Sequence, residues 1–335
     1  MAGPWVVALD GGGTKTALAL ASRQGEVVLL PEGPGCNPQD GGPWETTLTD
    51  LLGRATRAEG GLVAAVLGVP GRGEVPVHDE AVDALLARLL PCPFEAMNDV
   101  ALAHLGAFGG GEGVLLLAGT GSMAWARGTE GEARVGGWGD AFGDEGSAHW
   151  IGREALALAS RVLDGRTLVD PAPATGGRDG SGRIRDPSDP ETFVEALRSR
   201  LGPVAAGSFG PLAWLMARGG SRSAMAQVAR HVDALAEEGH QGARDILHQA
   251  ALMLTDLAWA AAHRTGLPPP FAWVASGSAF RSARLRAVAS QVLGAPAPSR
   301  LSTLGGGLLR AATLAGWSPS DAWAAQVDAR FPPAP

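Results

Sequence analysis

A pair of short apolar runs joined by a turn of small residues occurs twice in this chain, and this feature constrains the fold most. The first apolar run is Trp5–Leu9, which ends at Asp10 and three glycines before small and apolar residues resume and continue to Ala21. The second is Val114–Ala118, which a Gly-Thr-Gly-Ser turn joins to Met123–Arg127. Apolar runs of this length bounded by glycine are typical of strands in a hairpin. The repetition predicts two related α/β halves.

The rest of the chain supports a division into two domains. Its 335 residues suit about two domains of ordinary size. A glycine cluster at 109–113 predicts a boundary, so we expect an N-terminal domain over 1–112 and a larger C-terminal domain over 113–335. The last helix belongs either to the second domain or packs back on the first. A Gly/Pro/Asp/Arg-rich stretch at 164–189 is typical of a mobile surface loop.

Apolar spacing predicts the remaining elements. Helical spacing dominates 190–263 and indicates a helical insertion in the second domain. A short strand is expected to end at Asn98-Asp99. We also predict helices over 46–59, 81–90, 100–108 and 281–293, and buried strands over 62–69 and 271–275.

Composition excludes several classes of protein. With 45% hydrophobic and 18% charged residues, the chain is neither disordered nor a coiled coil. The net charge of -7 argues against nucleic acid or an anionic membrane as the main partner. The two cysteines, Cys36 and Cys92, cannot form a disulfide scaffold or a four-ligand zinc site.

The sequence also predicts a cytoplasmic protein. Residues 1–10 lack the cationic stretch and the cleavage site of a signal peptide. The most apolar long segment, 246–263, is interrupted by polar residues and its apolar positions recur with helical period, so we expect a core helix and no membrane span.

The first turn, Asp10 to Thr16, has the composition of a phosphate-binding site. Its glycines allow backbone N–H groups to approach a polyanion, and Thr14 and Lys15 add a hydroxyl donor and a positive charge. Asp10, at the end of a strand, is suited to hold Mg²⁺ through water. The spacing matches neither a Walker loop nor a dinucleotide fingerprint. A glycine-rich hairpin without a ligand is the alternative.

The second turn, Gly119–Ser122, repeats this chemistry in the other half. Two such turns suggest a clamp on the β- and γ-phosphates of a nucleotide. The segment Ser276–Ser278, at a junction of strand and helix, adds a small-residue corner against which a nucleotide can lie. An ordinary turn with a helix cap explains that segment equally well.

Carboxylates near glycines suggest a polyol site. Asp99 lies where a strand gives way to a helix, a position suited to a base that accepts a proton from an attacking hydroxyl, although Asn98-Asp99 is also a favourable helix cap. The segments 136–139 and 143–147 combine glycines with Asp144, Glu145 and Trp138. Glu145 either contacts a ligand, caps a helix or pairs with Arg153. Trp138 either stacks on a sugar or packs in the core.

These motifs contain the residue types that the chain otherwise avoids. Lys15 is the only lysine, and Asn37 and Asn98 are the only asparagines. A coding bias toward Arg, Ala, Gly and Pro explains the scarcity itself. The positions of the three residues make them candidates for functional roles.

Together the motifs resemble a known family. The segments DGGGTKT (10–16), ND (98–99), GTGS (119–122), GGWG (136–139) and GDEGSAHWIG (143–152) are similar to those of the BadF/BadG/BcrA/BcrD-type ATPases of the actin-like and sugar-kinase superfamily. More narrowly, they resemble N-acetylglucosamine kinases. The resemblance covers nearly the whole chain and implies two ribonuclease-H-like α/β domains of actin/hexokinase type, with mixed sheets flanked by helices around a cleft.

The resemblance implies specific roles. Asp99 would be the catalytic base for the 6-hydroxyl of an amino sugar, and Asp10 would position hydrated Mg²⁺. The loop 68–74 would face the substrate, but its Arg72 and Glu74 depart from the small residues usual there. ATP ligands would be Gly12, Gly13, Thr14, Lys15, Thr120, Ser276, Gly277 and Ser278, and substrate ligands Asn37, Asp99, Gly121, Ser122, Gly136, Gly137, Trp138 and Asp144.

The same resemblance leaves the activity open between related reactions. It implies ATP-dependent phosphorylation of N-acetylglucosamine, with glucosamine or N-acetylmuramic acid as alternative substrates, and a homodimer as the usual assembly. The family also includes nucleotide-driven activators of acyl-CoA dehydratases, which hold an iron–sulfur cluster through cysteines. Cys36 and Cys92 do not lie in such a setting, so the activator hypothesis is disfavoured.

Overall fold

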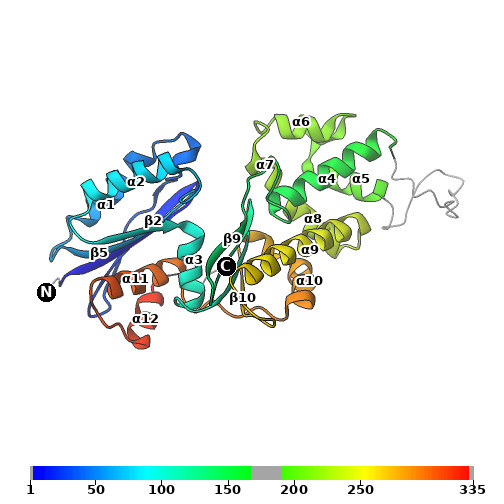
Figure 1. The fold of residues 1–335 in the computed structure, drawn as a ribbon. Coiled ribbons are helices and arrows are strands. Elements are labelled where there is room, and N and C mark those ends of the chain that lie inside the picture. The colour runs from blue at the N-terminus through cyan, green and yellow to red at the C-terminus, as the bar shows by residue number, and fades with distance from the viewer. Residues whose placement is uncertain (1–2, 167–189, 332–335) are drawn as a thin grey trace, which may run out of the picture. The chain divides into compact units, whose positions relative to one another are not determined.

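The computed structural model describes residues 3–166 and 190–331 (Figure 1). Most of the surface loop predicted at 164–189 therefore lies outside the described residues. Two compact units are present. The first contains the described residues up to Leu115, the segment Trp125–Thr129 and the described residues from Ala297 on, and the second contains Leu116–Ala124 and Glu130–Pro296. The domain boundary expected near residue 112 stays a prediction.

The first unit is built on a mixed sheet with strand order β3-β2-β1-β5-β6, in which β4 also pairs with β2. β2 runs antiparallel to β1, whereas β5 is parallel to both β1 and β6. The carboxyl ends of β1, β5 and β6 therefore lie at one edge of the sheet. The strands are β1 (Trp5–Gly11), β2 (Lys15–Ser22), β3 (Val27–Leu29), β4 (Gly33–Pro34), β5 (Leu62–Val69) and β6 (Phe94–Asn98).

Each face of this sheet carries its own helical layer (Figure 1). On β1, Val7 and Leu9 belong to a core shared with the helices α1 and α2, whereas Val6 and Ala8 belong to a core shared with α3, α11 and α12. This alternation follows from the period of two along a strand. The helices are α1 (Trp44–Ala55), α2 (Pro76–Leu89), α3 (Asp99–Phe108), α11 (Thr303–Leu314) and α12 (Asp321–Asp328).

Helices α3 and α11 approach one another through glycines. A Cβ at Gly306 would lie 2.4 Å from the backbone nitrogen of Gly106, and a Cβ at Gly307 would lie 2.8 Å from the Cβ of Ala8. The backbone N–H of Leu301 also donates to the carbonyl of Gly106 at 2.9 Å. Only glycine allows backbones to come this close, so the C-terminal helix α11 is part of the core of the first unit.

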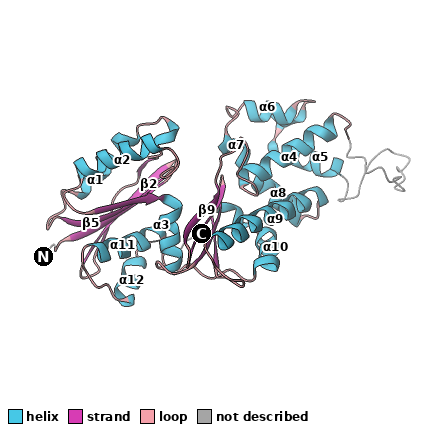
Figure 2. Ribbon diagram, viewed as in Figure 1, coloured by secondary structure: helices cyan, strands magenta, loops and turns pink. Residues whose placement is uncertain are grey.

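The second sheet has strand order β10-β7-β8-β9. Its strands are β7 (Gly113–Ala118), β8 (Ser122–Gly128), β9 (Gly131–Gly136) and β10 (Trp273–Ser276). The expected strands at 114–118, 123–127 and 271–275 are confirmed to within about two residues, whereas β9 was not predicted. Figure 2 draws the strands of both sheets in magenta.

Helices make up most of the second unit, as the spacing over 190–263 predicted. Helix α9 contacts β9, α10 packs on α9, and α4 packs on α5, α7, α8 and α9. No helix among residues 3–166 and 190–331 has the length and apolarity to cross a membrane. The helices are α4 (Ala148–Leu163), α5 (Pro190–Leu201), α6 (Gly210–Met216), α7 (Arg222–Ala226), α8 (Ala229–Glu237), α9 (Gln241–Arg264) and α10 (Ala283–Leu293).

Candidate active site

Asp10 lies near the end of β1, on the sheet face that α3 covers. It pairs with Gly68 of β5, which in turn pairs with Met97 of β6. A Cβ at Gly68 would lie 2.8 Å from Cδ2 of Leu102 and 3.2 Å from Cα of Asp99. The missing side chain at Gly68 therefore lets the first turn of α3 lie directly over β5, and this brings Asp99 to the side of the sheet that carries Asp10.

The electrostatics of Asp10 reflect that placement. Burial raises the pKa of Asp10 to about 7, the negative charge of Asp99 adds to the rise, and Lys15 opposes it. A carboxyl that is both desolvated and close to a second carboxylate gains from a proton or from a cation. The sequence predicted both residues as functional but did not predict that the charge of one acts on the pKa of the other.

The same chemistry tests whether Mg²⁺ fits here. Carboxylate oxygens are suitable ligands, and Mg²⁺ commonly keeps several waters while it binds only one or two carboxylates. In the described part of the chain, no three His, Cys, Asp or Glu side chains are grouped to hold a metal ion directly. Asp10, with Asp99 beside it, therefore fits a hydrated ion and not a site formed entirely by protein ligands.

Two glycines, one on each side of the contact, allow the first turn to lie against the segment 35–36. A Cβ at Gly11 would lie 2.5 Å from Sγ of Cys36, and a Cβ at Gly35 would lie 2.2 Å from the carbonyl oxygen of Gly13. The N–H of Cys36 donates to the carbonyl of Gly12 at 3.1 Å. The turn over residues 12–14 thus lies against the segment 35–36, and glycine is needed on both sides of the contact.

Lys15 extends from this turn into solvent. Its Nζ forms an ion pair with Oε1 of Glu32 at 3.0 Å, and the two side chains are 68% and 53% exposed. Exposed pairs of this kind contribute about 0–1 kcal/mol to stability, so the pair is easily exchanged for another anion. The predicted role of Lys15 toward phosphate stays a prediction.

Three loops that the sequence singled out meet beside α3. Gln39 donates from Nε2 to the carboxylate of Glu74 at 2.8 Å, and the N–H of Gln39 donates to the side chain of Asn37 at 3.0 Å. Asn98 donates from Nδ2 to the carbonyl of Arg72 at 3.2 Å. The segments 37–39, 71–74 and 98 therefore form one hydrogen-bonded group.

The helix-cap interpretation of Asn98-Asp99 applies to Asn98. The Asn98 side chain accepts from the N–H of Val100 at 2.9 Å and so caps α3. Asp99 is the first residue of the helix, and its own Oδ1 also accepts from Val100 at 3.0 Å.

The second turn is anchored to the start of α4. The N–H groups of Ala148 and His149 donate to the carbonyls of Gly119 and Thr120 at 2.9 and 3.3 Å. Ser122 is buried and its hydroxyl donates to the carbonyl of Glu145 at 2.7 Å. The carbonyls of the turn thus accept hydrogen bonds from N–H groups of α4, and the Ser122 hydroxyl donates a hydrogen bond to the segment 143–147.

Asp144 is buried and forms an ion pair with Arg222, which the sequence did not predict. Its Oδ1 accepts from the N–H of Ser122 at 3.2 Å, and its Oδ2 accepts from the guanidinium of Arg222. The side chain of Asp144 is 3% exposed and that of Arg222 is 41% exposed. Asp144 also adopts a φ of 58°, the one non-glycine residue with positive φ among those described. Such strain is typical of residues held for a function.

Glu145, next to Asp144, does not form the ion pair that the sequence left open. For Glu145 the sequence left open a pairing with Arg153, but the structure pairs Arg153 with Glu154 at 3.1 Å. The cap of α4 is Ser147, which accepts from the N–H of Trp150 at 3.1 Å.

Trp138 is 71% exposed, so the alternative that it packs in the core is wrong. The two glycines before it have φ values of 77° and 72°. Arg134 holds this strand end by donating to the carbonyls of Gly136 and Gly137 at 3.3 and 2.5 Å. The indole face is thus available to a ligand, such as the ring of a sugar.

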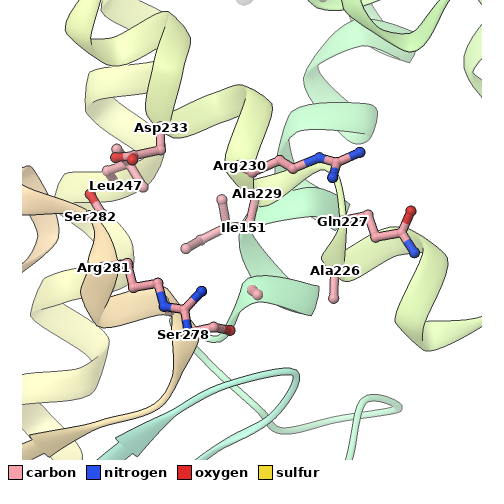
Figure 3. Close-up of a pocket in the computed structure, with 12 residues that line it drawn as sticks. Ile151, Ala226, Gln227, Ala229, Arg230, Asp233, Leu247, Ser278, Arg281 and Ser282 are labelled. Atoms are coloured by element: carbon pink, nitrogen blue, oxygen red, sulfur yellow. The ribbon is translucent and has the colours of Figure 1, made fainter. Parts of the chain in front are cut away.

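Ser278 lines a cavity of about 230 Å³ in the second unit (Figure 3). Gly277 precedes it with a φ of 97°, and a Cβ at Gly277 would lie 2.5 Å from the carbonyl oxygen of Ala118 and 2.9 Å from the nitrogen of Gly119. The corner 276–278 therefore lies directly against the second turn, and the structure brings these two predicted nucleotide elements together.

Burial alters the pKa of His104, of His149 and of Cys36. Burial lowers the pKa of His104 and of His149, so both are neutral near pH 7. Burial raises the pKa of the Cys36 thiol to about 11, which keeps it protonated.

Comparison with known proteins points to one group. A model of the BadF/BadG/BcrA/BcrD ATPase family matches residues 7–299. A curated relative, the N-acetylmuramic acid/N-acetylglucosamine kinase of Clostridium acetobutylicum, is 30% identical over 169 residues, which is 48% of this chain and 55% of the relative. The match thus spans about half the length of that relative.

Two solved structures share the fold. A candidate N-acetylglucosamine kinase from Chromobacterium violaceum aligns with a TM-score of 0.66 and 23% identity, and the alignment covers 92% of this chain and 99% of the other. A second candidate N-acetylglucosamine kinase, from Porphyromonas gingivalis, aligns with a TM-score of 0.55 and 20% identity over 92% of this chain and 98% of the other. The expected two-sheet α/β fold flanked by helices is confirmed.

Proposed function

The chain belongs to the BadF/BadG/BcrA/BcrD ATPase family, and from this premise we propose that it transfers the γ-phosphoryl group of ATP to the 6-hydroxyl of an amino sugar. N-acetylglucosamine is the first candidate substrate, because the curated relative is described as acting on it and on N-acetylmuramic acid. The observation that carries the proposal is the approach of Asp99 to Asp10 across Gly68.

The two carboxylates have different tasks in this proposal. Asp99 orients the sugar hydroxyl and accepts its proton as the new O–P bond forms. Asp10 would hold hydrated Mg²⁺, and the ion would supply positive charge that offsets the charge of the phosphates. Because the pKa of Asp10 is raised to about 7, its ionised form gains when a cation is bound nearby.

The turns provide the phosphate contacts. In the first turn, the residues Gly12–Lys15 offer backbone N–H groups, a hydroxyl and an ammonium group. In the second unit, Thr120 offers a hydroxyl. The corner at Ser276–Ser278 would contact the nucleoside. This corner touches the second turn through Gly277.

The proposed sugar ligands include both fixed and exposed groups. Asn37 belongs to the hydrogen-bonded group beside α3, and Asp144 is held by Arg222 and Ser122. Trp138 presents an exposed ring. Gly121, Gly136 and Gly137 would add backbone groups to the sugar site, and a Cβ at each of them would meet protein side chains. Fixed carboxylates suit the recognition of hydroxyls, because little side-chain entropy remains to be lost on binding.

The decisive experiment replaces Asp99 by Asn, which keeps the Oδ1 acceptor for the N–H of Val100 and removes the base. We expect sugar phosphorylation by Asp99→Asn to fall at least a hundredfold, in line with the usual contribution of a general base, while ATP binding persists. Asp50→Asn, on the exposed side of α1, is the matched control. Near-normal turnover of Asp99→Asn would contradict the proposed base.

A substrate panel tests the rest of the proposal. ATP consumption is measured with N-acetylglucosamine, N-acetylmuramic acid, glucosamine and N-acetylmannosamine, and without sugar. Strong dependence on one sugar supports a kinase and identifies its substrate. Turnover that ignores every sugar would contradict the proposal and favour a nucleotide-driven switch.

A further inference from the structure

The two turns proposed to bind phosphates differ in charge. The first turn carries its own cation, Lys15, whereas the second turn, Gly119–Ser122, contains no basic residue. A phosphoryl group in transfer carries negative charge on its oxygens, and enzymes that move it place Arg, Lys or a metal ion against those oxygens. A protein cation at the second turn would therefore have to come from another part of the chain.

Arg222 provides such a cation. It is the first residue of α7, and a Cβ at Gly121 would collide with its guanidinium, so this charged group lies against the second turn. The helix itself is held by close packing, because a Cβ at Gly152 of α4 would lie 2.1 Å from the carbonyl oxygen of Met225. The backbone that carries Arg222 therefore has little freedom to move away from the turn.

The ion pair with Asp144 leaves the guanidinium accessible to a second anion. The side chain of Asp144 is 3% exposed and that of Arg222 is 41% exposed, so most of the accessible surface of the pair belongs to the arginine. A guanidinium has five N–H donors in a planar fork, and the bond to Asp144 comes from one of its nitrogens. The remaining donors can bind an oxyanion.

The buried carboxylate also fixes the direction of the guanidinium. Oδ1 of Asp144 accepts from the N–H of Ser122 at 3.2 Å, and Oδ2 accepts from Arg222, so the carboxylate connects the arginine to the turn itself. A flexible arginine side chain loses rotational freedom when it binds an anion, and this loss weakens binding. Because Arg222 is already held, less of that entropy remains to be lost.

We propose that Arg222 binds the γ-phosphoryl group of ATP at the second turn and offsets the charge on its oxygens during transfer to the sugar. This inference rests on the proposed use of ATP and adds a catalytic residue from the helical insertion. Phosphate is favoured over a sugar hydroxyl as the partner, because a planar guanidinium matches the oxygens of an oxyanion and hydroxyls are neutral. Asp144 positions Arg222, whatever contact it also makes with the sugar.

The transfer step is balanced without a proton from the arginine. The bond from the γ-phosphorus to ADP breaks as the bond to the sugar 6-oxygen forms, and the hydroxyl proton goes to Asp99. Arg222 stays protonated throughout and acts only through its charge and its N–H donors.

Equilibrium binding of nucleotides to the intact protein, with Mg²⁺ and without sugar, tests the assignment. The probes are ATP and ADP, which differ by the γ-phosphoryl group. Arg222→Gln should weaken ATP binding at least about tenfold, as for the loss of a hydrogen bond to a charged group, and should change ADP binding by less than about threefold. The kcat for phosphorylation of the sugar that the substrate panel identifies should fall at least about a hundredfold.

A double variant separates a role toward phosphate from a role in the fold. Arg222→Gln leaves Asp144 buried without its cation, which destabilises the protein, whereas Arg222→Gln combined with Asp144→Asn removes both charges. The urea midpoint of the double variant should lie closer to that of the wild-type protein, while its preference for ATP over ADP should stay as low as in Arg222→Gln. Recovery of that preference would overturn the proposal, because Arg222 would then act only through the fold.

Arg218→Gln is the matched control. Arg218 is an exposed arginine shortly before α7, and its Cζ lies 4.2 Å from the ring centroid of Trp214. Its replacement should leave the binding of both nucleotides unchanged. Equal losses of ATP and ADP binding in Arg222→Gln would overturn the proposal. A change confined to the KM for sugar would also overturn it, because Arg222 would then act through Asp144 alone.

The outcome separates this inference from the proposed function. Absence of ATP binding in the wild-type protein would contradict the kinase proposal itself. Sugar phosphorylation by the wild-type protein, together with unchanged ATP binding and kcat in Arg222→Gln, would contradict only the assignment of Arg222.

Discussion

Arg222 and Asp144 form an ion pair over a position where only glycine fits. A Cβ at Gly121 would lie 2.4 Å from the guanidinium nitrogen of Arg222 and 2.7 Å from Oδ1 of Asp144. Gly121 is therefore required by the packing of this side-chain pair, whatever the role of the second turn toward phosphate.

Replacing Gly121 by Ala should break this arrangement. We expect Gly121→Ala to lose about 1–3 kcal/mol of unfolding free energy, the usual cost of overpacking, and to weaken sugar binding if Asp144 is a ligand. Gly119→Ala is the matched control in the same turn, because a Cβ there would meet no described atom within 4 Å. The urea midpoint and the KM for sugar check both variants. Equal effects in the two variants would contradict the steric explanation.

The raised pKa of Asp10 predicts a pH-dependent stability. Between about pH 4 and pH 7 the folded chain keeps a proton on Asp10 that the unfolded chain has lost, so this contribution to stability declines as the pH rises through that window. Asp10→Asn removes the titration. Relative to the wild-type protein, its unfolding free energy should increase by on the order of 3 kcal/mol from pH 5 to pH 8.

The measurement is urea unfolding at both pH values in the presence of a chelator, so that no divalent cation stabilises the ionised form. Asp50→Asn, whose carboxyl is exposed on α1, should show no such change with pH. A constant difference between Asp10→Asn and the wild-type protein would mean that Asp10 titrates normally.

Gly68→Ala tests the approach of α3 to β5. The added Cβ would meet Leu102 at 2.8 Å and the backbone of Asp99 at 3.2 Å, so the helix start must move away from Asp10. We expect a loss of about 1–3 kcal/mol in stability and at least a tenfold loss of kcat with little change in ATP affinity, because a small displacement of a catalytic group is costly.

Gly53→Ala serves as the comparison for this variant. Gly53 lies in α1, where a Cβ meets no described atom within 4 Å, and alanine should add about 0.5–1 kcal/mol to stability. Unchanged kcat in Gly68→Ala would contradict the placement of Asp99 as the base.

Lys15 offers a chemical test of the first turn. It is the only lysine, so an amine-specific reagent followed by peptide mapping reports on this residue separately from the terminal amine. We expect Mg²⁺ and ATP to slow its modification at least about threefold, because an ammonium group in contact with phosphate is less available as a nucleophile. Glu32→Gln, which removes the ion-pair partner, should not abolish the protection. A modification rate that is indifferent to nucleotide would exclude Lys15 from the phosphate site.

The strands and most helices were predictable because their signals are local. Apolar periodicity and glycine positions indicated the hairpins, the strand 62–69 and the helix after Asn98. A C-terminal helix was expected, but without residue bounds, because Gly305–Gly307 argue against a helix by propensity. In the structure these glycines allow close packing against α3, so tertiary contact outweighs the local preference.

The site was only partly predictable for a similar reason. Asp10 and Asp99 were both identified from their strand ends, but their proximity depends on the parallel pairing of β5 and on the missing side chain at Gly68. Arg222 lies 78 residues from Asp144 in a helical region, and nothing in the local sequence links the two.

The C-terminal helix α11 completes the core of the first unit, and this has a consequence during synthesis. Leu308 and Ala311 pack with Val6, Ala8 and Ala64, so the part of that sheet face that α3 does not cover is covered only once α11 has been translated. At the usual elongation rate of roughly 5–20 residues per second, the wait is on the order of ten seconds or more. During that time this part of the apolar face is exposed to solvent or to other segments of the nascent chain.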